Sequence, residues 1–182
     1  MKDTFVIGLT GAGGAGKDTV GGMLGHSMLA FAGPLKQGLA AMGFPEPSSR
    51  ASKEDLLPGY SFSWRQAAQT LGTEWGRSLQ PDIWLAITKS RVERMLAAYV
   101  VITDVRFHNE ADWVRENGLL VHVKGRRTSL TEEASKHASE HGMLPHAGDY
   151  MIRNADTLDD LRVSVLALQQ HINTVSNARR PQ

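Results

Sequence analysis

The stretch that most restricts the fold lies near the N-terminus, where residues 5–20 read FVIGLTGAGGAGKDTV. The apolar run 4–9, rich in β-branched residues, predicts a buried strand. Residues 17–24 predict a helix that is short, because each glycine within it costs about 1 kcal/mol relative to alanine. The glycine-rich turn between them has the spacing G-x-x-x-x-G-K. This order of elements predicts a loop whose backbone amides surround phosphate groups.

The expected phosphate loop departs from the common pattern at Asp18, which stands where a serine or threonine usually follows the lysine. This removes a hydroxyl that usually contacts Mg²⁺, but negative charge is favoured in the first turn of a helix. Asp18 could also accept a hydrogen bond from a water on Mg²⁺, and Thr19 still supplies a hydroxyl. Lys17 is expected to reach the β- and γ-phosphates of ATP. The residues expected to hold ATP here are Gly11, Gly13, Gly14, Ala15, Gly16, Lys17, Asp18 and Thr19.

Composition restricts the class of protein. The 20 Lys and Arg residues balance 19 Asp and Glu, so bulk charge gives no indication of a nucleic-acid polymer as partner. The absence of cysteine excludes disulfides, thiolate metal sites and cysteine nucleophiles. No apolar run approaches the roughly 20 residues of a membrane span, and the N-terminal run does not resemble a secretion signal. We therefore expect a cytoplasmic protein without a membrane partner, folded as one domain over residues 1–182.

The rest of the chain alternates expected strands with expected helices. Further strands are expected at 27–31, 99–103, 119–123 and 150–152. Helices are expected at 33–43, 63–79, 82 to about 98, around 110–117, and from 157. The second is helical at least to Leu71, with Ser63 as its cap. The third begins at Asp82 and has Leu85, Val92 and Leu96 in its apolar set. Residues 44–62 are rich in proline and are expected to form a surface insertion.

This alternation predicts an α/β fold of the P-loop NTPase class, with three α/β/α layers around a mainly parallel, five-stranded sheet. Right-handed crossovers place the carboxyl ends of the parallel strands on one side of the sheet, where open α/β sheets bind ligands. Gly11–Thr19, Asp104–Glu110 and Asn154 all follow predicted strand ends. These residues are therefore expected to converge.

A second candidate site follows the strand expected at 99–103. Asp104 stands at its tip, where an NTPase holds the carboxylate that organises its metal. Arg106 lies two residues further on, and arginine is well suited to grip phosphate through two hydrogen bonds. The residue types alone also fit a helix-capping aspartate and a surface arginine, and that alternative stays open.

Several short motifs occur in one order along the chain: GKDT, FAGPLK (31–36), RQAAQTLGTEWG (65–76), DIW (82–84), ITDVRFHNEA (102–111), HASE (137–140) and DYMIRNADTLDDL (149–161). Together they resemble the deoxynucleoside monophosphate kinases encoded by tailed bacteriophages and some bacterial genomes. A looser similarity to dephospho-coenzyme A kinase and phosphomevalonate kinase rests on the loop and on IRNADTLDDL. The resemblance implies ATP and Mg²⁺ as cofactors, ATP and a deoxynucleoside monophosphate (dNMP) as small-molecule partners, a possible homodimer and, for a phage-encoded chain, the host cytoplasm.

The resemblance also implies roles for individual residues. Asn154 is expected near the adenine, and Lys17, Asp104, Arg106 and Arg65 are the expected catalytic residues. An acceptor that is itself a phosphate brings extra negative charge toward ATP, which basic side chains would offset. The residues expected to line the acceptor site are Lys36, Arg65, Gly72, Thr73, Trp84, Asp104, Arg106 and Glu110. Taken alone, Lys36 and Arg65 also fit surface residues, and Trp84 also fits a core residue.

The polar segment 124–148 is expected to act as a lid. It is rich in basic residues, and a kinase with a small acceptor must exclude water from the transferring phosphoryl group. Arg126 is expected to contact ATP, although Arg127 fits equally well, and a solvated helix and loop remains the alternative. HASEH (137–141) matches the zinc pattern H-x-x-E-H. Gly142 and Pro145 end that helix, however, so no metal ligand is predicted.

The expected reaction is the transfer of a phosphoryl group from ATP to a deoxynucleoside monophosphate, giving ADP and a deoxynucleoside diphosphate. One alternative is a kinase of another small acceptor such as dephospho-coenzyme A. The other is a nucleotide-binding regulatory protein that transfers no phosphate. Arg106, Glu110 and the lid argue against the regulatory protein, since a pure binder needs none of them.

Overall fold

The computed structural model describes residues 4–49, 51–125, 143–154 and 156–179. The chain divides into two compact units. Unit 1 comprises Met1–Ala30 and Val92–Gln182, and unit 2 comprises Phe31–Arg91. The single domain expected from the sequence stays a prediction.

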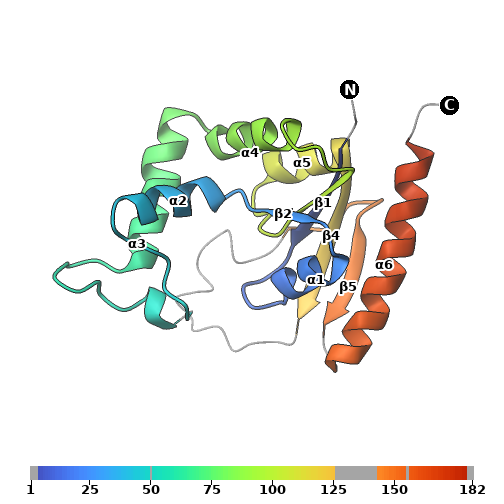
Figure 1. The fold of residues 1–182 in the computed structure, drawn as a ribbon, viewed down its shortest axis with the longest axis horizontal. Coiled ribbons are helices and arrows are strands. Elements are labelled where there is room, and N and C mark those ends of the chain that lie inside the picture. The colour runs from blue at the N-terminus through green and yellow to red at the C-terminus, as the bar shows by residue number, and fades with distance from the viewer. Residues whose placement is uncertain (1–3, 50, 126–142, 155, 180–182) are drawn as a thin grey trace. The chain divides into compact units, whose positions relative to one another are not determined.

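Unit 1 is built on a parallel five-stranded sheet (Figure 1). Its strands are β1 (Phe5–Thr10), β2 (Ser27–Leu29), β3 (Tyr99–Ile102), β4 (Gly118–Gly125) and β5 (Tyr150–Asn154). Their order is β2-β3-β1-β4-β5. Every residue of β1 is buried, as expected for a central strand covered on both faces. The predicted sheet is confirmed.

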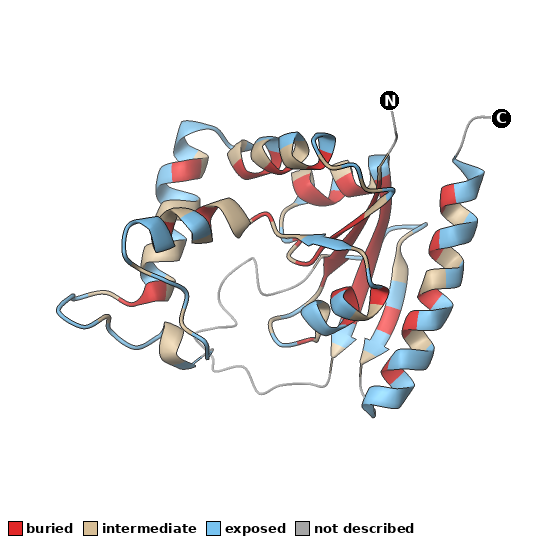
Figure 2. Cartoon of the chain, viewed as in Figure 1, coloured by how far each residue is buried: buried red, intermediate tan, exposed pale blue. Residues whose placement is uncertain are grey.

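Helices cover both faces of this sheet. Helices α1 (Lys17–Leu24) and α6 (Leu158–Ala178) pack on one face, where Ile7 and Leu9 of β1 join Val20 in the core. Helix α5 (His108–Asn117) packs on the other face. There a Cβ at Gly8 would lie 2.7 Å from Val114, which shows how closely α5 approaches β1. Figure 2 shows the buried residues along the strands between these helices. The predicted three-layer α/β/α fold is confirmed.

Helix α6 shows how a local signal and tertiary packing agree. The Thr157 side chain accepts a hydrogen bond from Asp160 N, and the Asp160 side chain accepts one from Thr157 N. This capping box begins the helix at the predicted position. The buried residues on one helical face are Leu161, Val165, Leu168 and Ile172. The other face is exposed, and none of the helices in the described ranges combines the length and the apolar content that crossing a membrane requires.

Unit 2 is helical. Its elements are α2 (Gly33–Ala41), η1 (Ala51–Lys53), α3 (Trp64–Gln69), the π-helix η2 (Thr70–Arg77) and α4 (Ile83–Glu93), whose last two residues belong to unit 1. The buried centre consists of Leu35, Leu39, Trp64 and Trp84. Ser63 caps α3 as predicted, because its Oγ accepts a hydrogen bond from Gln66 N at 3.2 Å. Most of segment 44–62 is exposed, although Phe44 and Leu57 pack against this core.

The helix expected over 63–79, at least to Leu71, is confirmed, but its type changes along its length. It is an α-helix up to Gln69 and continues as the wider η2, in which a Cβ at Gly76 would lie 2.6 Å from the ring of Trp84. A second helix expectation was wrong in its end point. The helix expected to reach residue 98 ends at Glu93, and Leu96 is 93% exposed rather than part of an apolar face. After Glu93 the chain turns, with Met95 N donating to Val92 O at 3.0 Å, and it then runs beside β1, where the Ala98 carbonyl accepts a hydrogen bond from Phe5 N at 2.9 Å.

Candidate functional site

The phosphate loop connects β1 to α1 through two glycines that no other residue could replace without strain. Gly16 has φ 94° and is the N-cap of α1, and no side chain caps that helix. A Cβ at Gly16 would lie 2.2 Å from Asn154 Nδ2. At Gly11, where φ is 139°, a Cβ would lie 2.3 Å from Val123 O. Because no side chain caps the first amides of α1, they can bind an anion.

Lys17 places a positive charge across this loop. Its Nζ donates hydrogen bonds to Gly11 O at 2.8 Å and to Ala12 O at 2.9 Å. The side chain therefore reaches back from the first residue of α1 to the first residues of the loop. Asp18 and Thr19, the next residues in the first turn, are both exposed.

The carboxyl ends of β4 and β5 contact the phosphate loop at Ala15. Asn154, the last residue of β5, donates from Nδ2 to Ala15 O at 3.0 Å. At Gly125, the last residue of β4, a Cβ would lie 2.6 Å from the Cα of Ala15. Asn154 thus has a structural contact with the loop that the sequence did not indicate. Its contact with adenine stays a prediction.

The segment after β3 runs beside the end of β1, since Val105 N donates to Leu9 O at 3.1 Å. Asp104 is half-buried, and Arg106 is exposed. Glu110 is only 2% exposed, and its Oε2 accepts hydrogen bonds from Arg106 N at 2.9 Å and Phe107 N at 3.1 Å. Glu110 therefore caps α5 and fixes the backbone of Arg106. Its predicted contact with an acceptor stays a prediction.

A role of Asp104 at an Mg²⁺ ion that accompanies ATP stays a prediction. Mg²⁺ prefers oxygen ligands, keeps several waters, and is usually held by one or two carboxylates together with substrate phosphates. Among the residues that the structure describes, no group of three His, Cys, Asp or Glu side chains could hold a metal by itself.

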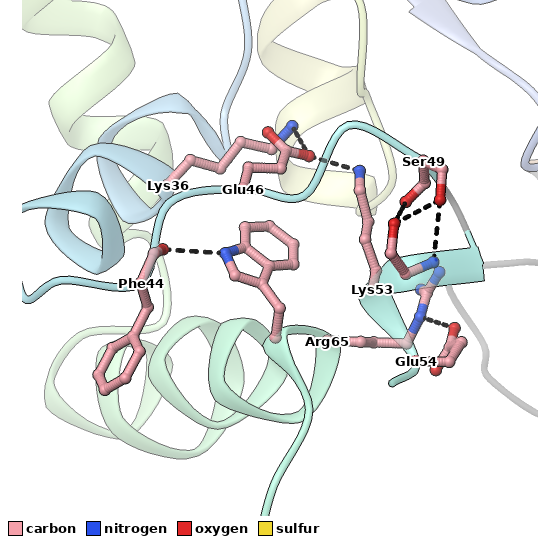
Figure 3. Close-up of polar contacts among 9 residues, drawn as sticks. Lys36, Phe44, Glu46, Ser49, Lys53, Glu54 and Arg65 are labelled. Carbon is pink, nitrogen blue, oxygen red and sulfur yellow. Dashed lines mark hydrogen bonds and ion pairs between the residues drawn. The ribbon is translucent and has the colours of Figure 1, made fainter. Parts of the chain in front are cut away.

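The remaining predicted acceptor residues lie in unit 2. Lys36 pairs with Glu46 at 3.1 Å, and Arg65 pairs with Glu54 (Figure 3). Thr73 is exposed on η2. Trp84 is 8% exposed and donates from Nε1 to Gly72 O at 2.7 Å, so the structure shows it as a core residue that holds η2 in place.

The structure thus divides the predicted site residues into two groups. Unit 1 gathers Gly11–Thr19, Asp104, Arg106 and Asn154 at the carboxyl ends of its parallel strands. Unit 2 holds the others, except Glu110 of α5 and Arg126. Arg126, Arg127 and the HASEH motif lie outside the described residues. Glu46, which pairs with Lys36, also pairs with Lys53, and no spacing pattern in the sequence indicates either residue.

The fold is shared with known structures. The chain superposes on the Thermus thermophilus protein TT1252 with a TM-score of 0.56 and 19% identity, covering 93% of this chain and 98% of that one. It matches a gluconokinase from Sinorhizobium meliloti 1021 with a TM-score of 0.53 and 15% identity, covering 99% and 100% of the two chains. At these identities the likeness shows the fold alone, a parallel α/β sheet covered by helices on both faces.

Sequence comparisons are more specific. A curated deoxynucleoside-5'-monophosphate kinase of Escherichia phage T5 is 33% identical over 129 residues, and the match covers 66% of this chain and 51% of the relative. The chain thus spans about half the length of that relative. The model of the deoxynucleotide monophosphate kinase family matches residues 50–165. This match includes the segment of Asp104, Arg106 and Glu110, and it covers more than half of the chain: the chain belongs to the deoxynucleotide monophosphate kinase family.

Proposed function

We propose that this protein transfers the γ-phosphoryl group of ATP to a deoxynucleoside monophosphate, giving ADP and a deoxynucleoside diphosphate. The observation that carries the proposal is the loop Gly11–Gly16, with an uncapped helix N-terminus behind it and Lys17 across it. Family membership adds the class of acceptor. Phosphoryl transfer asks little covalent chemistry of a protein, so positioning and charge carry most of the catalysis.

On the ATP side, the loop amides and Lys17 bind the β- and γ-phosphates. For the Lys17 ammonium this means exchanging its bonds to the Gly11 and Ala12 carbonyls for phosphate oxygens. The loop itself stays in place through the contact of Asn154 with Ala15. Mg²⁺ bound with ATP would neutralise charge on the phosphate oxygens. Asp104 is the carboxylate that would hold a water of that ion.

On the acceptor side, basic side chains are proposed to bind the negatively charged phosphate of the deoxynucleoside monophosphate. Lys36, Arg65 and Arg106 offset the repulsion between two phosphate groups and hold the acceptor in line. Glu110 aids Arg106 by holding its backbone N–H. Gly72, Thr73 and Trp84 form the remaining proposed acceptor contacts, with Trp84 acting from the core through its bond to Gly72. The segment 124–148, including Arg126, is proposed to close over the phosphates and exclude water.

The proposal is tested by ADP release with Mg·ATP against dGMP, dTMP, dCMP, dAMP and GMP. The wild type is expected to release ADP only when a suitable acceptor is present, and Lys17→Ala is expected to lose this turnover. Comparison of dGMP with GMP reports on the sugar, and dephospho-coenzyme A tests another acceptor. Binding of ATP without turnover on any nucleotide would refute the proposed function.

A further inference from the structure

A single carboxylate oxygen in unit 2 holds two lysine side chains (Figure 3). Glu46 Oε1 lies 3.1 Å from Lys36 Nζ and 2.5 Å from Lys53 Nζ. One ammonium group comes from α2 and the other from the last residue of η1, and both point at the same position. Two cations that converge on one anionic oxygen also suit a phosphate oxygen, which lysine binds as a point charge.

The fold, and not Glu46 alone, sets the position of Lys53. Lys53 Nζ lies 5.4 Å from the centre of the Trp64 ring, within the range of a cation–π interaction. The ring is fixed, because Trp64 is 5% exposed and donates from Nε1 to Phe44 O at 3.1 Å. The start of η1 is held by Ser49, whose Oγ accepts a hydrogen bond from Ser52 N at 3.0 Å. The Lys53 side chain is therefore less exposed than that of Lys36.

Glu46, by contrast, is suited to being replaced. Partial burial raises the pKa of Glu46, but hydrogen bonds and charge from Lys53 and Lys36 outweigh this and hold its pKa below the ordinary value. It is therefore a single negative charge at neutral pH. Its side chain is 30% exposed, and ion pairs near the surface contribute little to stability. A phosphate monoester carries about −1.5 to −2 at pH 7, so the same two lysines attract it more strongly.

We propose that Lys53 is a further binding residue for the acceptor phosphate, and that Glu46 holds the place of that phosphate until the acceptor displaces it. The inference rests on the proposed function, in which Lys36 binds the acceptor. It adds Lys53 to that site and assigns Glu46 as a competitor of the substrate. Segment 44–62, expected from the sequence to be a surface insertion, then supplies substrate-binding side chains.

The two residues must act in opposite directions on the acceptor, and this separates the inference from a structural ion pair. Lys53→Gln removes a charged hydrogen bond to phosphate, and the KM for the acceptor is expected to rise about tenfold. Glu46→Gln removes the competing charge, and the same KM is expected to fall, by about fivefold. If the cluster only stabilised the fold, both variants would raise this KM or leave it unchanged.

The experiment measures steady-state kinetics at saturating Mg·ATP with whichever of dGMP, dTMP, dCMP or dAMP the wild type phosphorylates fastest. The KM for ATP is measured in parallel and is expected to change less than about twofold. Lys53→Arg, which keeps the charge, is expected to stay close to the wild type and shows that the site folds when residue 53 is changed. Arg162→Gln and Asp159→Asn make the same charge changes in an exposed ion pair of α6 and serve as matched controls.

A rise with Lys53→Gln, a fall with Glu46→Gln and unchanged controls support the inference. Shifts of the same sign in both variants, no shift in either, or equal shifts in the α6 controls would overturn it. A wild type that shows no acceptor-dependent turnover would instead remove the proposed function itself, so the two failures are distinguishable.

Discussion

Replacing Asp149 should destabilise unit 1 more than any exposed ion-pair substitution. Asp149 directly precedes β5 and its side chain is 2% exposed. Arg115 of α5 donates to it from Nε at 3.0 Å and from Nη2 at 2.9 Å. His122 Nε2 of β4 lies 2.9 Å from the same carboxylate, which also accepts from His146 N at 2.9 Å. One carboxylate thus ties the start of an edge strand to β4 and α5.

The loss of stability expected for Asp149→Ala can be judged from the charge of Arg115, which loses its buried partner. Removing one partner of a buried ion pair costs about 3–5 kcal/mol, because the other charge stays buried and uncompensated. Arg115 is 19% exposed and keeps Asp112 at 3.0 Å, so the cost lies at the lower end, about 3 kcal/mol. The matched control is Asp112→Ala, which removes the 61% exposed partner of the same arginine and should cost about 0–1 kcal/mol.

Urea unfolding followed by circular dichroism measures both variants against the wild type. We expect a clearly lower urea midpoint for Asp149→Ala and a nearly unchanged midpoint for Asp112→Ala. Equal free energies of unfolding for the two variants, or a loss below about 1 kcal/mol for Asp149→Ala, would show that the cluster is not the anchor described.

Three further predictions concern the same core and the phosphate loop. Burial raises the pKa of Asp149, but hydrogen bonds from Arg115, His146 and His122 lower it far more. The contribution of Asp149 to the free energy of unfolding is therefore present above the unfolded pKa of 3.8 and is lost as the pH falls below it. Acid unfolding of Asp149→Asn should lack this pH dependence. Asn154→Ala should raise the KM for ATP roughly fivefold by releasing Ala15, with little change in the acceptor KM, and an unchanged ATP KM would refute the support role. Gly16→Ala should raise the ATP KM further, since it adds strain at φ 94° to the loss of the Asn154 contact; an effect smaller than that of Asn154→Ala would contradict this reasoning.

The parts of the fold that could be predicted are those with local causes. The strand, loop and helix at 5–24 are fixed by residue spacing, and the cap at Ser63 by side chains three residues apart. The start of α6 at residue 157 was also predicted, although its capping box was not. The π-helical form of η2 was not predicted. Within η2, Gly76 lies close against the ring of Trp84, a residue of the next helix, and no local sequence pattern indicates this contact.

The site was predictable to the same extent. The carboxyl ends of parallel strands meet at one edge, so the convergence of the loop with Asp104 and Asn154 follows from topology. The pairing of Glu46 with Lys36 and Lys53 depends on how segment 44–62 folds onto Trp64. The hydrophobic periodicity of the sequence does not predict this arrangement. Arg115 donates to Asp149, and His122 bonds to the same carboxylate, across 34 and 27 positions of the sequence, so no local pattern indicated these bonds either.

Transfer of the γ-phosphoryl group from ATP to a deoxynucleoside monophosphate can be followed directly with a label on that group. The protein is incubated with Mg²⁺, γ-labelled ATP and each deoxynucleoside monophosphate, and the products are separated, with Lys17→Ala beside the wild type. We expect label in a deoxynucleoside diphosphate with the wild type and no label in that product with Lys17→Ala. Label found only in ATP or in inorganic phosphate, with every acceptor, would contradict it.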